Sequence, residues 1–300
     1  MASISVDNDV SNCNLKRRKL ECTEAEELHS SLSKAQLQGN VDLYRHISLF
    51  LPDARCVSTV QLLCKAFMEF QKDLLLEWKL DWAYGILEGR YVSAEKLKYL
   101  RNGSIKYVCL EHLFLRNDGA RALAETLKVN FSLIELRIGS NKIRDEGANA
   151  IGKALRVNTS LTEIRLYRNE IGAEGAKTIG EALKVNASLT KINLADNNIG
   201  DEGAKGIAEG LKLNTSLIMI DLRYNDIGTE GGKAIGEALK VNTSLTDIDL
   251  GHSYIGDEGG KAIGEALKVN TSLTEISLDG NNIGDEGGKA IGEALKVNTS

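Results

Sequence analysis

A period of 28 residues constrains this chain more than any other feature of its sequence. Leucine recurs at this spacing, and Ile105 has the same phase one period earlier. The recurring residues are Leu133, Leu161, Leu189, Leu217, Leu245 and Leu273. Seven units of this length fill residues 105–300, which predicts an array of stacked copies of one supersecondary unit.

The first part of each unit predicts a short strand followed by a bend. It follows the pattern L-x-x-L-x-L-x-x-N-x-L, seen as Leu161, Ile164, Leu166, Asn169 and Ile171. The alternation in its middle is typical of a strand with one buried face. The Asn side chain both donates and accepts hydrogen bonds, so we expect it to satisfy backbone groups where the chain leaves the strand.

The second part of each unit predicts an amphipathic helix. Ala234, Ile235, Ala238, Leu239 and Val241 form an apolar stripe in one such unit. A glycine within the helix costs about 1 kcal/mol relative to alanine. Its recurrence therefore indicates close packing between neighbouring helices. The glycines concerned are Gly180, Gly236, Gly264 and Gly292.

One unit is too small to be stable alone, because its few buried side chains do not offset the entropy of ordering its backbone. Stacking must supply the difference. Strands stack about 4.8 Å apart, whereas helix axes need about 8–10 Å, so the array must curve with its strands inside. We therefore predict an α/β solenoid, a right-handed β-α horseshoe of seven 28-residue units, preceded by a small α-helical region.

Units such as LTEIRLYRNEIGAEGAKTIGEALKVNAS resemble the ribonuclease-inhibitor class of leucine-rich repeats, which also occur in Ran GTPase-activating proteins and NLR-type receptors. The resemblance covers about two thirds of the chain and implies a scaffold for protein partners. Leu113 and Ser253 replace the expected Asn, and we expect Ser253 to weaken the ladder locally. The last unit nearly copies the one before it, which predicts either a fragment truncated at its C-terminus or an open end for self-association.

Composition limits the classes of partner and compartment. A formal net charge of −5 and a pI near 5.6 argue against nucleic acid, which requires a dense basic face. We expect no membrane partner, and the cytoplasm as the location, because no secretory or membrane-spanning pattern is present. The cysteines are odd in number and lack zinc spacing, which favours a reducing compartment. They are Cys13, Cys22, Cys56, Cys64 and Cys109.

Asn-x-Ser sequences recur once per unit and would mark glycosylation in a secreted chain. We interpret them instead as helix ends, where Asn tolerates the left-handed conformation and Ser begins the next turn. The asparagines are Asn130, Asn158, Asn186, Asn214, Asn242, Asn270 and Asn298.

The region before the repeats has two parts. Residues 1–40 are polar and predict a flexible tail, and their basic cluster Lys16–Lys19 resembles a nuclear-localisation signal. Residues 41–104 predict a small helical region or N-terminal cap.

Within that region, residues 42–82 resemble an F-box, which implies docking of a Skp-type adaptor of a cullin ubiquitin ligase. The resemblance rests on the helix Ile47–Leu51, the stretch Leu63–Lys65, Phe67 and Trp78. Asp42-Leu43 stands where Leu-Pro is usual, and a helical cap would give much the same pattern.

We predict no catalytic, cofactor or metal site, and so no enzyme. The stretch from Gly172 to Thr178 has the wrong spacing for a phosphate loop. The four histidines form no metal-binding pair, and doublets such as Asp201-Glu202 fit helix-dipole complementarity. A Ran-type GTPase regulator remains an alternative, although repeat spacing identifies no residues for that activity.

The outward strand positions vary from unit to unit, whereas the helix residues barely change. We therefore predict that a protein partner binds the concave strand face, whose charge runs from mixed or basic to acidic. Tyr and Arg are favoured as interface anchors. The predicted contacts are Arg137, Glu163, Arg165, Tyr167, Arg168, Asp221, Arg223, Tyr224, Asp249 and His252.

Overall fold

The computed structural model describes Leu100 and residues 105–300. The predicted tail at residues 1–40 with its basic cluster, and the predicted small helical region at residues 41–104 with its F-box-like residues 42–82, lie outside the described residues, Leu100 excepted. The account of the fold that follows concerns the repeat domain alone.

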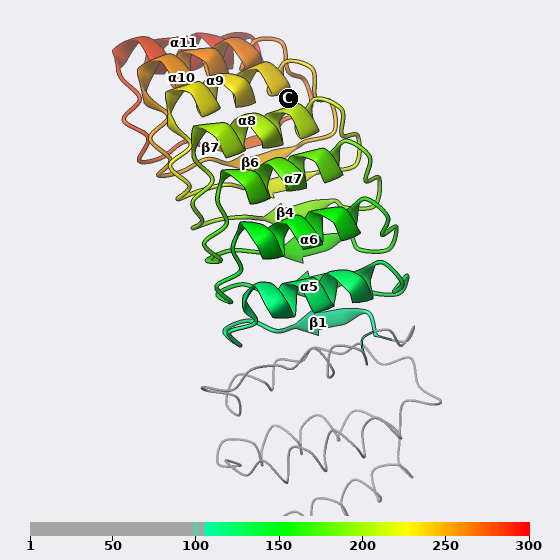
Figure 1. The fold of residues 1–300 in the computed structure, drawn as a ribbon. Coiled ribbons are helices and arrows are strands. Elements are labelled where there is room, and N and C mark those ends of the chain that lie inside the picture. Colours follow the sequence, from blue (N-terminus) through cyan, green and yellow to red (C-terminus); the bar gives the residue numbers. More distant parts are fainter. Residues whose placement is uncertain (1–99, 101–104) are drawn as a thin grey trace, which may run out of the picture. The chain divides into compact units, whose positions relative to one another are not determined.

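Every predicted unit contains one strand and one helix (Figure 1). The strands are β1 (Tyr107–Cys109), β2 (Glu135–Arg137), β3 (Glu163–Arg165), β4 (Lys191–Asn193), β5 (Met219–Asp221), β6 (Asp247–Asp249) and β7 (Glu275–Ser277). The helices are α5 (Arg116–Leu127), α6 (Asp145–Leu155), α7 (Ala173–Leu183), α8 (Gly200–Leu211), α9 (Gly228–Leu239), α10 (Gly256–Leu267) and α11 (Asp285–Val297).

The strands form one parallel sheet in the order β1 to β7, and each residue pairs with the residue 28 positions later, as Ile164 does with Ile192. The helices stack along one side of this sheet (Figure 1). The sheet does not close on itself, so the predicted horseshoe-type α/β solenoid is confirmed. Val241 was wrongly placed in the helical stripe, because α9 ends at Leu239 and the Val241 side chain is 58% exposed.

The predicted asparagine ladder holds the bend after each strand. Asn169 Oδ1 accepts the backbone N–H groups of Asn141 and Ile143, at 2.9 and 3.2 Å. Its Nδ2 donates to the carbonyl oxygen of Ile138 at 2.8 Å. All these partners belong to the preceding unit, and Asn169 is fully buried. The ladder therefore satisfies buried backbone groups and ties neighbouring units together.

Ser253 continues the ladder with fewer bonds, as predicted. Its hydroxyl lies 3.3 Å from the Leu222 carbonyl oxygen and accepts the Asn225 N–H at 3.4 Å. A hydroxyl carries one proton and a primary amide carries two, so Ser253 serves fewer carbonyl groups than asparagine does. Leu113 provides no polar side chain, and its own N–H is donated to Asn141 Oδ1 at 2.9 Å.

A second asparagine ladder lies at the ends of the helices. Asn158 Nδ2 donates to the carbonyl oxygens of Leu127 and Asn130 in the preceding unit, both at 2.8 Å, and Oδ1 accepts the Leu161 N–H. The predicted left-handed conformation was wrong, because none of the described Asn-x-Ser asparagines has a positive φ. The helix ends through side-chain hydrogen bonds instead. The Asn158 amide nitrogen is buried and bonded, so it cannot carry a glycan in the folded domain.

The recurring helix glycines allow neighbouring helices to touch, as predicted. A methyl group at Gly180 would collide with the Gly206 carbonyl group, and one at Gly236 would lie 2.8 Å from the Ala262 carbonyl oxygen. Gly292 in α11 has nothing within 4 Å of that position. The final described unit is accordingly less covered, and its Leu295 is 65% exposed. No helix in residues 105–300 combines the length and apolarity needed to cross a bilayer.

Candidate binding face

The strands position the predicted contact residues on the side of the sheet opposite the helices. In β3 the central Ile164 is buried, whereas Glu163 and Arg165 are partly exposed. Five of the predicted contacts lie on strands, namely Arg137, Glu163, Arg165, Asp221 and Asp249. The other five lie in the turns after the strands, namely Tyr167, Arg168, Arg223, Tyr224 and His252. We call these ten residues the strand face.

The turns hold their side chains in a fixed orientation. Arg168, Tyr224 and His252 have φ values of 53°, 56° and 54°, in the left-handed region. The Tyr224 N–H donates to the Gly251 carbonyl oxygen at 2.9 Å, and the His252 N–H donates to that of Asp279 at 2.8 Å. A left-handed residue occurs at this position in most units, so the conformation belongs to the repeat. These side chains therefore project from an ordered backbone.

The basic residues of β2 and β3 are neutralised by carboxylates. Arg137 pairs with Glu135, and Arg165 Nε lies 2.7 Å from the Glu163 carboxylate and its Nη2 3.9 Å from that of Glu135. Burial opposes the charge of Arg137, but the Glu135 hydrogen bond and charge outweigh it and raise the Arg137 pKa. This half of the strand face is therefore mixed in charge, which is one of the two predicted alternatives.

The strand face is acidic from β5 to β7. Asp221 is only 2% exposed and accepts hydrogen bonds from Asn193 Nδ2 at 2.9 Å and from the Arg223 N–H at 3.2 Å. The Arg223 guanidinium lies 3.1 Å from the Asp221 carboxylate and 3.6 Å from that of Asp249. The geometry thus makes Asp221 a residue that positions Arg223, whose side chain stays half-exposed on the strand face.

Burial raises the pKa of the Asp221 carboxyl, and the nearby Arg223 partly opposes this shift. The pKa of Asp247 is raised by burial first and then by the carboxylates of Glu275 and Asp249. The Asp247 shift reflects, after burial, the crowding of carboxylates on this part of the sheet. A cation brought by a partner would relieve that repulsion.

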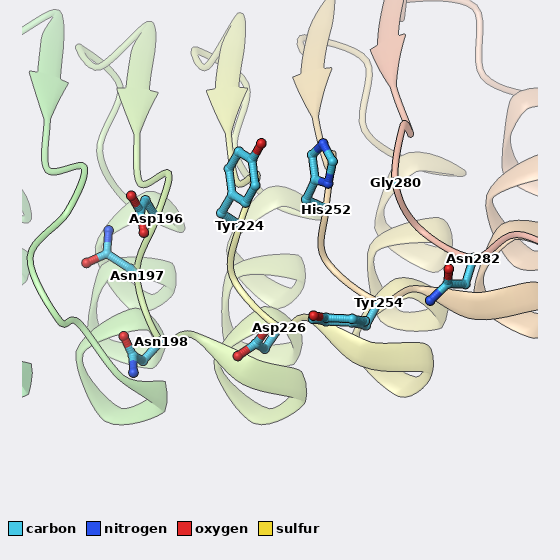
Figure 2. A pocket seen from close by; sticks show the side chains of 9 residues that line it. All are labelled: Asp196, Asn197, Asn198, Tyr224, Asp226, His252, Tyr254, Gly280 and Asn282. Carbon is cyan, nitrogen blue, oxygen red and sulfur yellow. The ribbon is translucent and has the colours of Figure 1, made fainter.

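Two rows of side chains border a groove of about 400 Å³ beside β4 to β7 (Figure 2). One row contains Asp196, Tyr224 and His252, and the other contains Asp226 and Tyr254. The rings of Tyr224 and His252 are stacked, with centroids 4.6 Å apart and planes 2° from parallel. The groove therefore has an aromatic wall formed by residues of two successive units.

Tyr167 and Arg168 were predicted as contacts because tyrosine and arginine are common interface anchors, but both side chains already contact other residues of the domain. The Tyr167 ring lies against Gly139, where a methyl group would collide with it. Arg168 Nε donates to the Asp196 carboxylate at 2.6 Å, and this hydrogen bond and charge raise the Arg168 pKa. Both remain on the strand face, but each already has a contact within the domain.

The features that could be mistaken for chemistry are part of the scaffold. Asp201 Oδ1 accepts the Gly231 N–H of the next helix at 2.7 Å, and Asp145 Oδ1 accepts the Gly172 N–H at 2.8 Å. The acidic doublets therefore cap neighbouring helices as well as complementing their dipoles. Within the part of the chain that the structure describes, no cluster of three or more His, Cys, Asp or Glu side chains could hold a metal ion.

A family model described as "Leucine Rich repeat" matches the chain in six consecutive stretches, at residues 129–152, 157–180, 185–208, 213–236, 241–264 and 269–292. These are leucine-rich repeats. Their spacing is the 28-residue period, and each match begins just after one helix and covers the next strand and most of the next helix. The expected leucine-rich repeat architecture is thereby confirmed, and the ribonuclease-inhibitor subclass stays a prediction.

Several solved structures are similar to this chain, one of them titled a leucine-rich repeat-containing protein. Actin-binding site 2 of leiomodin-1 is 24% identical over 50% of this chain and 87% of that one, with a TM-score of 0.43. The tropomodulin C-terminal domain of Caenorhabditis elegans is 20% identical over 50% and 91%, with a TM-score of 0.41. LegL7 of Legionella pneumophila is 16% identical over 70% of each chain, with a TM-score of 0.45. No curated protein sequence matches the chain.

The second row of the groove was missed in the sequence. Asp226 and Tyr254 lie one residue after the ladder position of their leucine-rich repeats, between that position and a buried isoleucine. The residue at this point changes from unit to unit, from Glu170 to Asn198, Asp226, Tyr254 and Asn282. That variation between constant neighbours was the available signal.

Proposed function

We propose that this domain is a protein-interaction scaffold whose partner binds the strand face. One observation carries the proposal: side chains that differ from repeat to repeat project from a scaffold that is nearly constant. Parallel strands and turns hold these side chains in order, and the helices cover the other side of the sheet. Curved repeat arrays offer such extended surfaces for recognition.

The helix side supports this choice by contrast, because it presents the same ion pairs in successive repeats. Lys212 pairs with Glu209 and Lys240 pairs with Glu237, each at 2.6 Å. These exposed pairs neutralise each other and differ little between units, so they offer little specificity. The strand face changes in charge and in aromatic content along its length.

Reversing two charges tests the proposal. Arg165→Glu combined with Arg223→Glu is expected to weaken partner capture at least about tenfold, because arginine anchors often contribute much of the binding energy of an interface. The midpoint of thermal unfolding should fall only modestly, because the exposed Arg165 pairs contribute at most about 1 kcal/mol and the buried Asp221 keeps its hydrogen bonds from Asn193 Nδ2 and from the backbone N–H of residue Arg223. Capture is measured by quantitative mass spectrometry after affinity purification of the full chain.

Lys212→Glu combined with Lys240→Glu, on the helix side, is the matched control and should leave capture unchanged. A large loss of stability in the Arg165 and Arg223 variant would make these residues part of the scaffold. Equal loss of capture by both double variants would contradict binding at the strand face.

We propose as a second candidate that residues 42–82 recruit a Skp-type adaptor, so that the repeats would select targets for a cullin ubiquitin ligase. The hydrophobic sequence Ile47–Leu51 and the Leu63–Lys65 stretch support this, together with Phe67 and Trp78. Recovery of adaptor and cullin by the full chain, and their loss without residues 1–104, is the expected result. Failure to recover any adaptor would count against it, and stimulated GTP hydrolysis would instead favour the Ran-type alternative.

A further inference from the structure

The groove has one wall that belongs to the strand face and is already held by contacts within the domain. His252 Nε2 lies 2.9 Å from the Asp279 carboxylate, and the His252 ring lies against Gly280, where a methyl group would collide with it. Tyr224 stacks on the other face of this ring. The wall is therefore rigid before any partner arrives, which lowers the entropic cost of binding.

Tyr224 keeps part of its ring exposed in this arrangement. His252 covers only one side of its ring, and the side chain is 51% exposed. Figure 2 shows Asp196 on the side of Tyr224 away from His252, and Tyr254 reaching toward Asp226 across the lower row. A flat group entering the groove can thus stack on Tyr224 and meet carboxylates at its edges.

The acidic lining of the groove favours a positively charged group. Its lining contains Asp196 and Asp226 but no lysine or arginine. Among the described residues, Asp196 pairs with Arg168 at 2.6 Å, whereas Asp226 forms no ion pair and is exposed. The groove therefore attracts a cation and repels phosphates and carboxylates.

We propose that this groove receives an arginine side chain from the protein partner, an inference that rests on the proposed function of the strand face. A guanidinium is planar, stacks on aromatic rings and donates in a fork that matches a carboxylate. Stacking on Tyr224 places its donors beside Asp196, and Asp226 in the facing row adds a negative charge across the groove. Lysine carries the charge without the flat surface, so the groove prefers arginine.

Three peptides, each tested for binding to the full chain, distinguish the contribution of positive charge from that of stacking on Tyr224. The probes are fluorescent peptides with four Gly-Arg, four Gly-Lys or four Gly-citrulline repeats, followed by fluorescence anisotropy. Citrulline keeps the shape of arginine without its charge. The arginine peptide is expected to bind about tenfold more tightly than the lysine peptide, which lacks the stacking contact, and the citrulline peptide should not bind measurably.

Variants assign the binding to the groove. Tyr224→Leu and Asp226→Asn should each weaken the arginine peptide about tenfold, whereas Tyr224→Phe, which keeps the ring, should not. Glu181→Gln on the helix side is the matched control and should have no effect. Equal affinity for the arginine and lysine peptides, retained affinity in Tyr224→Leu, or binding of citrulline would overturn the arginine assignment.

Partner capture distinguishes this inference from the proposed function. If Arg165→Glu with Arg223→Glu abolishes capture and Tyr224→Leu with Asp226→Asn does not, the strand face binds and the groove assignment fails alone. If neither double variant changes capture, the proposed function itself fails. Loss of capture in both, with the peptide preference for arginine, is the result we expect.

Discussion

Gly180→Ala is expected to destabilise the repeat domain by about 1–3 kcal/mol, the usual cost of overpacking. The new methyl carbon would lie 2.6 Å from the Gly206 carbonyl carbon, and a backbone group of the neighbouring helix α8 cannot move aside as a side chain can. This loss should appear even though alanine favours an isolated helix by about 1 kcal/mol over glycine. Equilibrium urea denaturation of the full chain, followed by circular dichroism, measures it.

Gly292→Ala is the matched control, at the equivalent position of α11. Nothing lies within 4 Å of the new methyl group, so only the helix propensity changes. We expect a gain of up to about 1 kcal/mol. If the free energy of unfolding changed in the same direction in both variants, close helix packing would not explain the recurring glycine.

Asn169→Ala is expected to cost about 3 kcal/mol, because it leaves the buried N–H groups of Asn141 and Ile143 without their acceptor. It also removes the donor to the Ile138 carbonyl oxygen at 2.8 Å. Neighbouring repeats share these bonds, so the loss should reduce unfolding cooperativity as well as the midpoint. Urea denaturation followed by both circular dichroism and hydrogen exchange measures the two effects.

Asn225→Ala provides the comparison within the same ladder. Asn225 Nδ2 donates to the Leu194 and Leu222 carbonyl oxygens, but its Oδ1 has no hydrogen-bond partner. Its removal should therefore cost clearly less than removal of Asn169. If Asn225→Ala were the more damaging change, the acceptor bonds of the ladder would not be its main contribution.

The repeat architecture was predictable because the same sequence pattern recurs in each unit. Leu161, Ile164, Leu166 and Asn169 predicted a buried strand side and a capped bend, and their copies removed the ambiguity that one short strand would leave. The helix glycines predicted contact for the same reason. The end of the helix was less predictable, because Val241 continues the apolar pattern although α9 ends at Leu239, whose carbonyl oxygen accepts from Asn270 of the next unit.

The candidate site was only partly predictable. The phase of the repeat brings Arg168 beside Asp196 and Tyr224 beside His252, since residues 28 apart lie in adjacent units. Burial of Asp221 did not follow from phase, because it depends on how far the Asn193 and Arg223 side chains reach. The same limit applies to the second row of the groove, because the repeat phase does not show that Asp226 and Tyr254 line one groove with Tyr224 and His252.

Photo-crosslinking from single positions of the full chain distinguishes the two sides of the repeat domain most directly. Benzoylphenylalanine is introduced in place of Arg165 or Arg223 on the strand face, or in place of Glu181 or Glu237 on the helix side. Binding at the strand face predicts that the first two positions cross-link the same partner and that the last two do not. Cross-links of that partner from the helix positions, with none from Arg165 or Arg223, would contradict it.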